Sequence, residues 1–523
     1  MNLSAQRYPI GIQTFSKVRE KGLLYVDKTE YVHRLIGYGQ YVFLSRPRRF
    51  GKSLLLSTIE AFYRAKKELF EGLDIAKYEH DWLPREVLHL DFTGMNYSNP
   101  DSLRDILVST LDGWERKYGV VPTSQSPDLR FGEVIKAAFD YAKRKVVILV
   151  DEYDKPLQDT AENEKLQTQF RSELRGVYGN LKKMDAFIEF AMLTGVTKMG
   201  KLSIFSDLNN LKDISMTEEF SGICGITENE LHHYLGPGVE EFARENNMSV
   251  GEAFETLKRN YDGYHFAPKT KLDIYNPFSM MNALQDREIN YYWFETGTPY
   301  YLVKQIKKRE IPLHTFESVK ESRDSVMNVS FDLKTTLIPV LYQSGYLTIK
   351  GYDAVTRILT LGFPNLEVRR GFLLELMSVY TNKSENSTWA DIVGFYEDVI
   401  DGKVDDFMQR LQSLYSDFNR DGFTFIDLEQ HYQDIAYLVF KLLGCITHTE
   451  YRTAKGRIDM TVETSQRIFV FEFKLDGTAR EAMEQIENRG YLLPFKADGR
   501  ELVKIGASFS SETHSLKDWI IEY

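Results

Sequence analysis

One stretch of this sequence, residues 41–57, constrains the fold more than any other. It reads YVFLSRPRRFGKSLLLS, in which an apolar run gives way to a polar loop, to Gly51-Lys52-Ser53 and then to three leucines. A buried strand, a short loop and a helix that starts at Gly-Lys-Ser form the layout of a P-loop. There, backbone N–H groups and the positive end of the helix bind phosphates. The stretch therefore predicts a nucleotide-binding α/β domain.

The loop departs from the general P-loop pattern at its first position, where Arg46 replaces a glycine. Gly-Lys-Ser alone is a weak signal, because so short a motif arises by chance in many chains; its place between a strand and an apolar helix gives it weight. We predict that the nucleotide binds along the whole loop, which consists of Arg46, Pro47, Arg48, Arg49, Phe50, Gly51, Lys52 and Ser53.

Further apolar runs predict the rest of a parallel sheet. They occupy residues 87–92, 145–150 and 187–194, and helical stretches of suitable length separate them. Strands alternating with helices form right-handed βαβ units, with helices on both faces of a parallel sheet. We therefore expect an α/β domain that extends to about residue 215.

Two carboxylates follow the strand at residues 145–150, at the edge of a parallel sheet where ligands bind. We predict that Asp151, with Ser53, holds Mg²⁺ and that Glu152 orients or deprotonates the attacking water. Lys52 would reach the β- and γ-phosphates. The alternative is an acidic pair that only caps a helix after a core strand.

Thr194 ends the last of these strands, just before Gly195. Its hydroxyl is a candidate sensor of the γ-phosphate. The equally simple alternative is a threonine that merely ends a strand.

The last hundred residues have a different pattern. A helix at 428–443 precedes three strand-like runs at 445–452, 457–462 and 468–475. A further helix at 478–493 and a strand at 501–507 complete an α-β-β-β-α-β order.

Two of these strands carry charged residues among apolar ones. Asp459 lies between Ile458 and Met460, while Glu472 and Lys474 share one face of the following strand. Burying these charges costs several kcal/mol unless something compensates, and a divalent metal held by Asp459 and Glu472 would do so.

Lys474 would then polarise a water or a phosphate oxygen, as in phosphodiester hydrolysis. Gln485, on the next helix, is a candidate for the same site. The alternative is a salt bridge between exposed side chains at a strand edge.

The composition limits the partners and the compartment. A net charge of −11 argues against non-specific coating of nucleic acid, so phosphate contacts must come from local basic patches. The two cysteines cannot form a disulfide scaffold and fit a reducing compartment. The sequence shows neither a signal-peptide core nor an apolar run of membrane-spanning length. We therefore predict a cytoplasmic protein without a membrane partner.

The residues quoted so far lie within motifs of two known families. The N-terminal half resembles the predicted AAA-ATPase-like family of bacteria, through YVDKTEYV, FLSRPRRFGKSLLLS, LFEGLDI, VILVDEYD, LTGVTK and NNLKDIS. The C-terminal stretch resembles the PD-(D/E)xK nuclease domain, which has a restriction-endonuclease-like fold, through EYRTAKGRIDM and FVFEFKLDGTAREAMEQI. The AAA-ATPase-like family shares the PRRFGKS pattern, so the Arg46 departure does not weaken this match.

The resemblance implies an ATP-binding module fused to a metal-dependent nuclease. The motif matches are Lys52 and Ser53 in Walker A, Asp151 and Glu152 in Walker B, and Asp459, Glu472, Lys474 and Gln485 in the nuclease site. An acidic residue on the first helix of the nuclease domain often assists, and Glu429 is the nearest candidate.

Four segments follow from these patterns: residues 1–215 as the AAA-ATPase-like domain, 216–290 as a lid or winged-helix-like region, 291–420 as a helical connection without an assigned role, and 421–523 as the nuclease-like domain. A hairpin is expected at residues 346–361 within the third segment.

The leading hypothesis is a DNA nuclease controlled by ATP, with Mg²⁺ at both sites and Mn²⁺ as an alternative at the nuclease site. A neighbouring copy in a homo-oligomer could supply an arginine finger. The main alternative is an ATP-dependent switch or scaffold whose nuclease fold binds nucleic acid or protein without cutting. A small-molecule kinase would leave the last hundred residues without a purpose.

Overall fold

The computed structural model describes residues 7–198, 210–294, 311–327, 337–381, 385–416, 428–513 and 515–523, together with Leu208 and Ile306. The chain divides into two units. The first comprises Met1–Thr296 with Val319–Glu367, and the second comprises Gly297–Ser318 with Val368–Tyr523. Each unit is described by itself.

A five-stranded sheet forms the centre of the first unit. Its strand order is β2-β3-β4-β1-β5, and every pair is parallel. The strands are β1 (Tyr41–Ser45), β2 (Val87–Asp91), β3 (Val146–Asp151), β4 (Ile188–Gly195) and β5 (Lys212–Asp213). Every residue of β3 is buried, as expected for a central strand covered on both faces. The predicted parallel sheet is thus confirmed.

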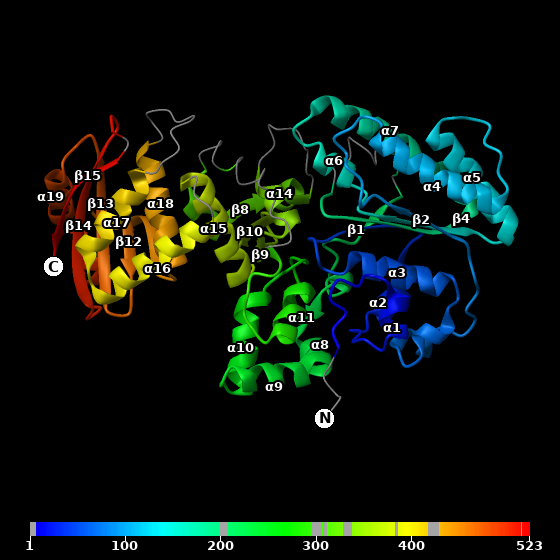
Figure 1. Ribbon diagram of the computed structural model, residues 1–523, viewed down its shortest axis with the longest axis horizontal. Helices are drawn as coiled ribbons and strands as arrows, with labels where there is room; N and C mark the ends of the chain where they lie inside the picture. Colours follow the sequence, from blue (N-terminus) through cyan, green and yellow to red (C-terminus); the bar gives the residue numbers. More distant parts are fainter. Residues whose placement is uncertain are drawn as a thin grey trace. The chain divides into compact units, whose positions relative to one another are not determined.

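Helices cover both faces of this sheet. In Figure 1, α4, α5 and α7 lie on one side and α1, α2 and α3 on the other. Leu103, Leu107 and Leu111 of α4 recur every four residues, so they form one apolar face, which packs into the core. The helices of this region are α1 (Phe15–Glu20), α2 (Thr29–Tyr38), α3 (Lys52–Tyr63), η1 (Lys67–Phe70), η2 (Asp74–Lys77), α4 (Ser102–Tyr118), α5 (Pro127–Ala142), α6 (Lys155–Asp159), α7 (Glu164–Lys183) and η3 (Asp185–Phe187).

The next part of the first unit, where the sequence predicts a lid or winged-helix-like region, is mostly helical. Its helices pack on one another through an apolar core that includes Leu235, Phe242, Leu257 and Met280. The elements are η4 (Glu218–Phe220), β6 (Ile226–Thr227), α8 (Glu228–Glu230), η5 (Leu231–Leu235), α9 (Gly236–Glu245), α10 (Val250–Tyr261), β7 (Ile274–Tyr275) and α11 (Pro277–Asp286).

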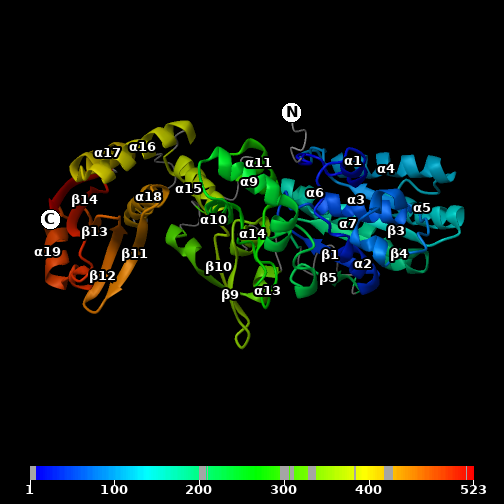
Figure 2. The same ribbon diagram turned by 90° about the horizontal axis from the view of Figure 1, so that it is seen from below.

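A three-stranded antiparallel sheet completes the first unit, with the order β8-β10-β9. The expected hairpin at residues 346–361 is confirmed as β9 and β10, and Figure 2 shows it as a projecting pair of strands. The elements are β8 (Val319–Ser322), α13 (Arg323–Met327), α14 (Leu337–Ser344), β9 (Thr348–Asp353) and β10 (Ile358–Gly362).

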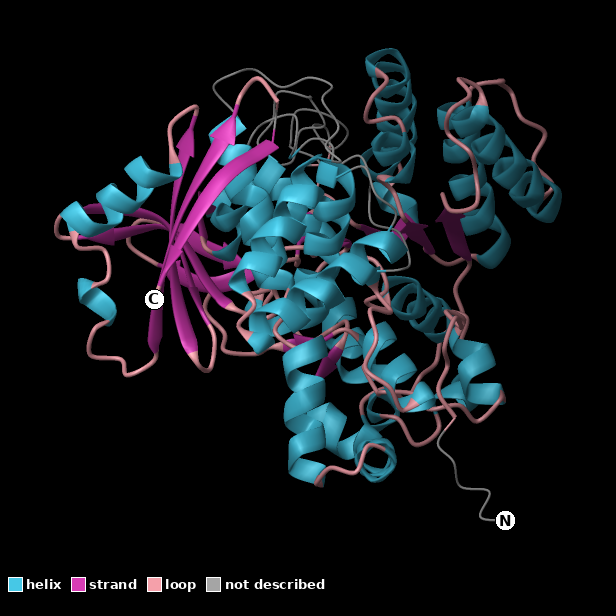
Figure 3. Ribbon diagram, turned by 60° about the vertical axis from the view of Figure 1, so that its left-hand side comes forward, coloured by secondary structure: helices cyan, strands magenta, loops and turns pink. Residues whose placement is uncertain are grey.

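The second unit holds a mixed five-stranded sheet with the order β11-β12-β13-β14-β15 (Figure 3). Within this sheet β13 and β14 run parallel, and the other neighbouring strands are antiparallel. The strands are β11 (Ile446–Thr453), β12 (Gly456–Glu463), β13 (Arg467–Leu475), β14 (Glu501–Ser510) and β15 (Ser515–Glu522). The helices of the C-terminal part are η7 (Leu313–Glu317), α15 (Leu366–Thr381), α16 (Glu385–Asp401), α17 (Val404–Ser416), α18 (Leu428–Leu442), α19 (Ala479–Arg489) and η8 (Leu493–Phe495).

The predicted α-β-β-β-α-β order is confirmed from α18 to β14, and β15 is an addition to it. The two faces of β13 differ. Val470 packs with Met483 of α19, whereas Phe471 contacts Phe440 of α18. This alternation places α19 and α18 on opposite faces of the sheet.

Candidate functional sites

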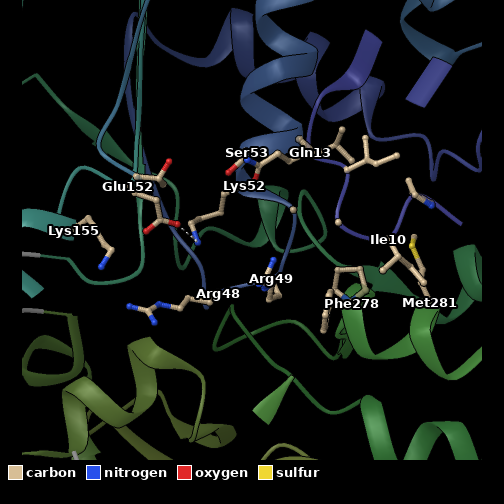
Figure 4. A pocket seen from close by; sticks show the side chains of 17 residues that line it. Ile10, Gln13, Arg48, Arg49, Lys52, Ser53, Glu152, Lys155, Phe278 and Met281 are labelled. Atoms are coloured by element: carbon tan, nitrogen blue, oxygen red, sulfur yellow. Dashed lines mark ion pairs between the residues drawn. The ribbon is translucent and has the colours of Figure 1, made fainter. Parts of the chain in front are cut away.

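A cavity of about 380 Å³ opens at the P-loop of the first unit (Figure 4). The turn before α3 forms one wall. There Gly51 adopts φ +94°, a left-handed conformation that favours glycine. The lining residues are Pro9, Ile10, Gly11, Ile12, Gln13, Arg48, Arg49, Gly51, Lys52, Ser53, Leu54, Thr93, Glu152, Lys155, Pro277, Phe278 and Met281.

Lys52 is the best-buried cation on the cavity wall. Its Nζ donates to the carbonyl oxygens of Arg46 at 3.1 Å and Pro47 at 3.2 Å. The same atom lies 3.4 Å from Oε1 of Glu152. The ammonium thus lies among two carbonyl oxygens and one carboxylate, at the wall where phosphate oxygens could reach it.

The acidic end of β3 gathers the other predicted ligands. Asp151 is buried, and its Oδ1 accepts hydrogen bonds from Thr194 Oγ1 at 2.7 Å and from the Glu152 N–H at 3.0 Å. Burial raises the pKa of Asp151, against an opposing hydrogen bond from Ser53. A cation at this position would offset the cost of burying the charge, so these residues fit a magnesium site.

Two of the predicted loop residues turn their side chains away from the cavity. The buried Arg46 guanidinium donates to the carbonyl oxygens of Ser215 at 2.8 Å and Phe220 at 3.2 Å, and it lies 4.1 Å from the centre of the Phe266 ring. Phe50 packs edge-on against Tyr264. That the nucleotide binds along the whole loop stays a prediction, and these two side chains have their partners outside the cavity.

Both side chains hold the loop against the residues that follow the sheet, because their carbonyl and aromatic partners lie there. Pro47 lies near Gly345, where a Cβ on the glycine would meet the proline ring at 2.7 Å.

Asp154 is a buried carboxylate that the sequence reasoning missed. It accepts hydrogen bonds of 2.6 Å from the N–H and from Oγ1 of Thr197, and Gln158 Nε2 donates to it as well. Burial raises the pKa of Asp154. An acid three residues after Asp151 in VDEYD was the available signal, but nothing local distinguishes it from a surface residue.

The second cluster lies in the C-terminal unit, on one face of its sheet. Met460 of β12 pairs with Phe471 of β13 in an antiparallel register. Asp459 and Glu472 therefore occupy neighbouring positions on the two strands. Both carboxylates are buried, with 8% and 1% exposure. The alternative of a salt bridge between exposed side chains is therefore wrong about the exposure of the carboxylates, although Glu472 does pair with Lys474.

Hydrogen bonds connect the four predicted residues of this cluster. Lys474, Gln485 and Glu472 bond to one another through their side chains, and Asp459 bonds to the backbone of β13. Lys474 Nζ lies 3.0 Å from Glu472 Oε1 and donates to Gln485 Oε1 at 2.9 Å. Gln485 Nε2 donates to the same Glu472 oxygen. Asp459 Oδ2 accepts from the N–H of Phe473 at 2.8 Å. Two acids, an ammonium and an amide thus meet at one place.

These residues fit a divalent cation with few protein ligands. Across the part of the chain that the structure describes, no three His, Cys, Asp or Glu side chains form a metal cluster. Two carboxylates suffice for Mg²⁺, which keeps several of its waters. The side chain of Glu429, on α18, lies outside the described residues.

A basic turn adjoins this cluster, and we define it by its four exposed cations, Arg452, Lys455, Arg457 and Arg489. Tyr491 ties the turn to the cluster, because its hydroxyl donates to the carbonyl of Arg457 at 2.7 Å and accepts from Gln485 Nε2 at 3.3 Å. Arg489 also donates to the carbonyl of Lys455 at 3.1 Å.

Comparisons with known proteins identify the family of each of the two regions that hold these clusters. A family model described as "Predicted AAA-ATPase" matches residues 9–205, and one for the PD-(D/E)XK nuclease superfamily matches residues 427–519. A protein of Azotobacter chroococcum mcd 1 is 32% identical over 99% of this chain and 99% of its own length. The chain belongs to the predicted AAA-ATPase family. Its relative is described only as an "Uncharacterized protein in vnfD 5'region".

The resemblance seen in the sequence is thus confirmed for both regions of this predicted AAA-ATPase. The first matched region contains the P-loop cavity residues from Arg48 to Lys155, and the second contains the acidic cluster. No described helix is long and apolar enough to cross a membrane.

Proposed function

We propose that the chain binds and hydrolyses ATP at the P-loop and cleaves DNA at the acidic cluster under ATP control. The observation that carries the first half is the meeting of Lys52, Ser53, Asp151, Glu152 and Thr194 beside one cavity. Such a set can bind a triphosphate and activate a water molecule.

Each residue would have a defined part in hydrolysis. Lys52 binds the β- and γ-phosphates, and Ser53 and Asp151 would hold Mg²⁺, whose charge would offset that of the phosphate oxygens. Glu152 orients the attacking water and accepts its proton. Thr194 fixes the Asp151 carboxylate through its hydrogen bond.

The apolar part of the cavity suits the nucleobase. Ile10, Phe278 and Met281 line this part, and all three lie outside the phosphate-binding loop in the sequence. An aromatic ring beside aliphatic side chains offers a flat apolar surface to a purine.

Asp459 and Glu472 support phosphodiester hydrolysis at the second site. A bound divalent cation would supply an activated water and polarise the scissile phosphate. Lys474 would stabilise the negative charge of the transition state, and Gln485 would hold the Lys474 ammonium in place.

The basic turn supports nucleic acid as the substrate. Because the whole chain is acidic, phosphate contacts must come from such a local patch. The Tyr491 hydroxyl joins the Arg457 carbonyl to Gln485 of the cluster, and Arg489 donates to the Lys455 carbonyl in the same turn. The cations of this turn are therefore suited to hold the backbone that flanks the cleaved bond.

We place this activity in the cytoplasm, since Cys224 and Cys445 are free thiols.

A second candidate function has its own support. Lys474 and Gln485 already satisfy Oε1 of Glu472, which is an arrangement that can stand without metal. This favours an ATP-dependent switch or scaffold that binds nucleic acid or protein without cutting it.

Two assays on the purified full chain test the two halves of the proposal. Release of phosphate from ATP with Mg²⁺ should fall to background in Lys52→Ala. Nicking of plasmid DNA with Mg²⁺ or Mn²⁺ should disappear in Asp459→Ala and Lys474→Ala but persist in Glu484→Gln, which alters an exposed acid on the same helix as Gln485. Undiminished nicking by both Asp459→Ala and Lys474→Ala would contradict the assignment of the second site.

A further inference from the structure

Two arginines of the P-loop, Arg48 and Arg49, line the cavity, and their side chains have different partners. The Arg49 guanidinium lies 5.0 Å from the centre of the Phe278 ring, on the apolar side of the cavity. Arg48 Nη2 donates to Gln158 Oε1 at 3.2 Å, and Gln158 belongs to α6, which begins at Lys155, shortly after Asp151 and Glu152. In Figure 4 the Arg48 side chain extends toward the side where Glu152 and Lys155 lie.

We propose that Arg48 contacts the transferred phosphate from within the same chain, as an internal arginine finger, and that Gln158 positions it. The inference rests on the proposed ATP hydrolysis and adds the residue that stabilises its transition state. No copy of the chain would then have to lend an arginine to its neighbour.

Arg48 is held at both ends. Trp293 Nε1 donates to its carbonyl oxygen at 3.0 Å, which fixes the backbone, and Gln158 fixes the guanidinium. A side chain held in this way loses little conformational entropy when a ligand arrives, so it is preorganised for binding.

A buried charge sets the orientation of Gln158. Asp154 is fully buried, and its Oδ2 accepts from Gln158 Nε2, so the NH₂ group of Gln158 is turned toward it. The amide oxygen then faces Arg48 and accepts from it. These two hydrogen bonds, from Gln158 to Asp154 and from Arg48 to Gln158, connect the acidic end of β3 with the phosphate-binding loop.

The chemistry favours an arginine at this place. The phosphoryl group in transfer spreads its charge over three oxygens, and a guanidinium has five N–H donors in a planar fork. The bond to Gln158 uses one of them. An arginine finger contributes about 10³- to 10⁵-fold to kcat in phosphoryl transfer.

The test compares ATP hydrolysis by Arg48→Ala, Arg49→Ala and Gln158→Leu, with binding of a fluorescent ATP analogue measured in parallel. We expect Arg48→Ala to lose about a thousandfold in kcat, with analogue affinity within a few fold of the unaltered chain. Arg49→Ala should instead raise KM more than it lowers kcat. Gln158→Leu should lower kcat by about tenfold at unchanged KM, and added guanidinium should restore part of the activity of Arg48→Ala.

Mixing variants distinguishes an arginine in the same chain from one in a neighbour. Lys52→Ala retains Arg48 but cannot bind ATP productively, so a mixture of Lys52→Ala and Arg48→Ala would recover activity if the arginine acted between chains. We expect no recovery. Recovery of activity in the mixture, or hydrolysis by Arg48→Ala at the unaltered rate, would overturn the inference about Arg48. Neither result would contradict the proposed function. An unaltered chain that hydrolyses no ATP would overturn the proposed function itself.

Discussion

Thr194 Oγ1 donates a hydrogen bond of 2.7 Å to Oδ1 of Asp151 and so joins the carboxyl ends of β4 and β3. Asp151 is buried, and its pKa is raised by that burial. The hydroxyl is therefore placed to keep the carboxylate ionised and correctly turned for a cation.

Thr194→Val keeps the shape of the side chain and removes this hydrogen bond. A hydrogen bond to a charged group is worth about 1.5–3 kcal/mol, so ATP turnover should fall by at least about tenfold. The measurement is kcat across a range of Mg²⁺ concentrations, where the variant should also need more Mg²⁺. Thr194→Ser is the matched control and should retain most of the activity; equal rates for Thr194→Val and the unaltered chain would exclude this role.

Arg46 should matter for stability more than for nucleotide binding. Its guanidinium donates to three carbonyl oxygens, those of Ser45, Ser215 and Phe220, and it is buried over the Phe266 ring. Arg46→Met would leave these acceptors without their donor, at a cost of about 2–4 kcal/mol of unfolding free energy. Arg46→Lys should recover only part, since a lysine lacks the planar fork.

Urea unfolding of the full chain, followed by tryptophan fluorescence, would measure this effect. The account is contradicted if Arg46→Met unfolds at the same urea concentration as the unaltered chain and only its ATP affinity changes.

Asp262 should make stability depend on pH. Burial raises the pKa of this carboxyl from 3.8 to about 6, although a hydrogen bond from the Gly263 N–H opposes the change. Folding therefore favours the protonated form. The associated stability is present below pH 3.8 and is lost as the pH rises through about 6.

Asp262→Asn is neutral at every pH and should avoid that loss. We expect it to raise the free energy of unfolding by about 1–3 kcal/mol at pH 8 and to change it little at pH 4. Urea unfolding at both pH values gives the comparison. A benefit that is as large at pH 4 as at pH 8 would show that the charge is not responsible.

The basic turn should bind DNA through phosphate charge. In EDTA, where cleavage is suppressed, removing one cation that neutralises a phosphate should reduce the slope of log Kd against log salt by about 0.9. We expect such a change in Lys455→Ala and in Arg489→Ala. Lys403→Ala removes an exposed lysine paired with Asp401 and should leave the slope unchanged. Slopes that agree among all three variants and the unaltered chain would exclude the turn as the DNA-binding surface.

The sequence sufficed for features that depend on local pattern. The parallel strands, the helix that starts at Lys52 and the β-β-β-α-β order around Asp459 all follow from apolar runs of the right length and from the residues between them. The final strand was missed because apolar residues do not alternate in Ser515–Glu522, and all of its residues except Leu516 are partly buried or exposed.

Features that depend on contacts between residues far apart in the sequence could not be predicted from local pattern. Arg46 is directed inward by carbonyls about 170 residues further on, and no local pattern separates it from Arg48. Asp154 is buried because Thr197, at the end of another strand, supplies its donors. The roles of the individual site residues stay predictions until their variants are measured.

The most direct test of the central claim is the rate of DNA cleavage with Mg²⁺, measured with and without ATP on the full chain. The account predicts that ATP changes the rate, that Lys52→Ala cleaves at a rate insensitive to ATP, and that Lys474→Ala does not cleave. Cleavage that is identical with and without ATP would contradict the control of one site by the other. ATP hydrolysis without any cleavage would instead establish the chain as a switch or scaffold.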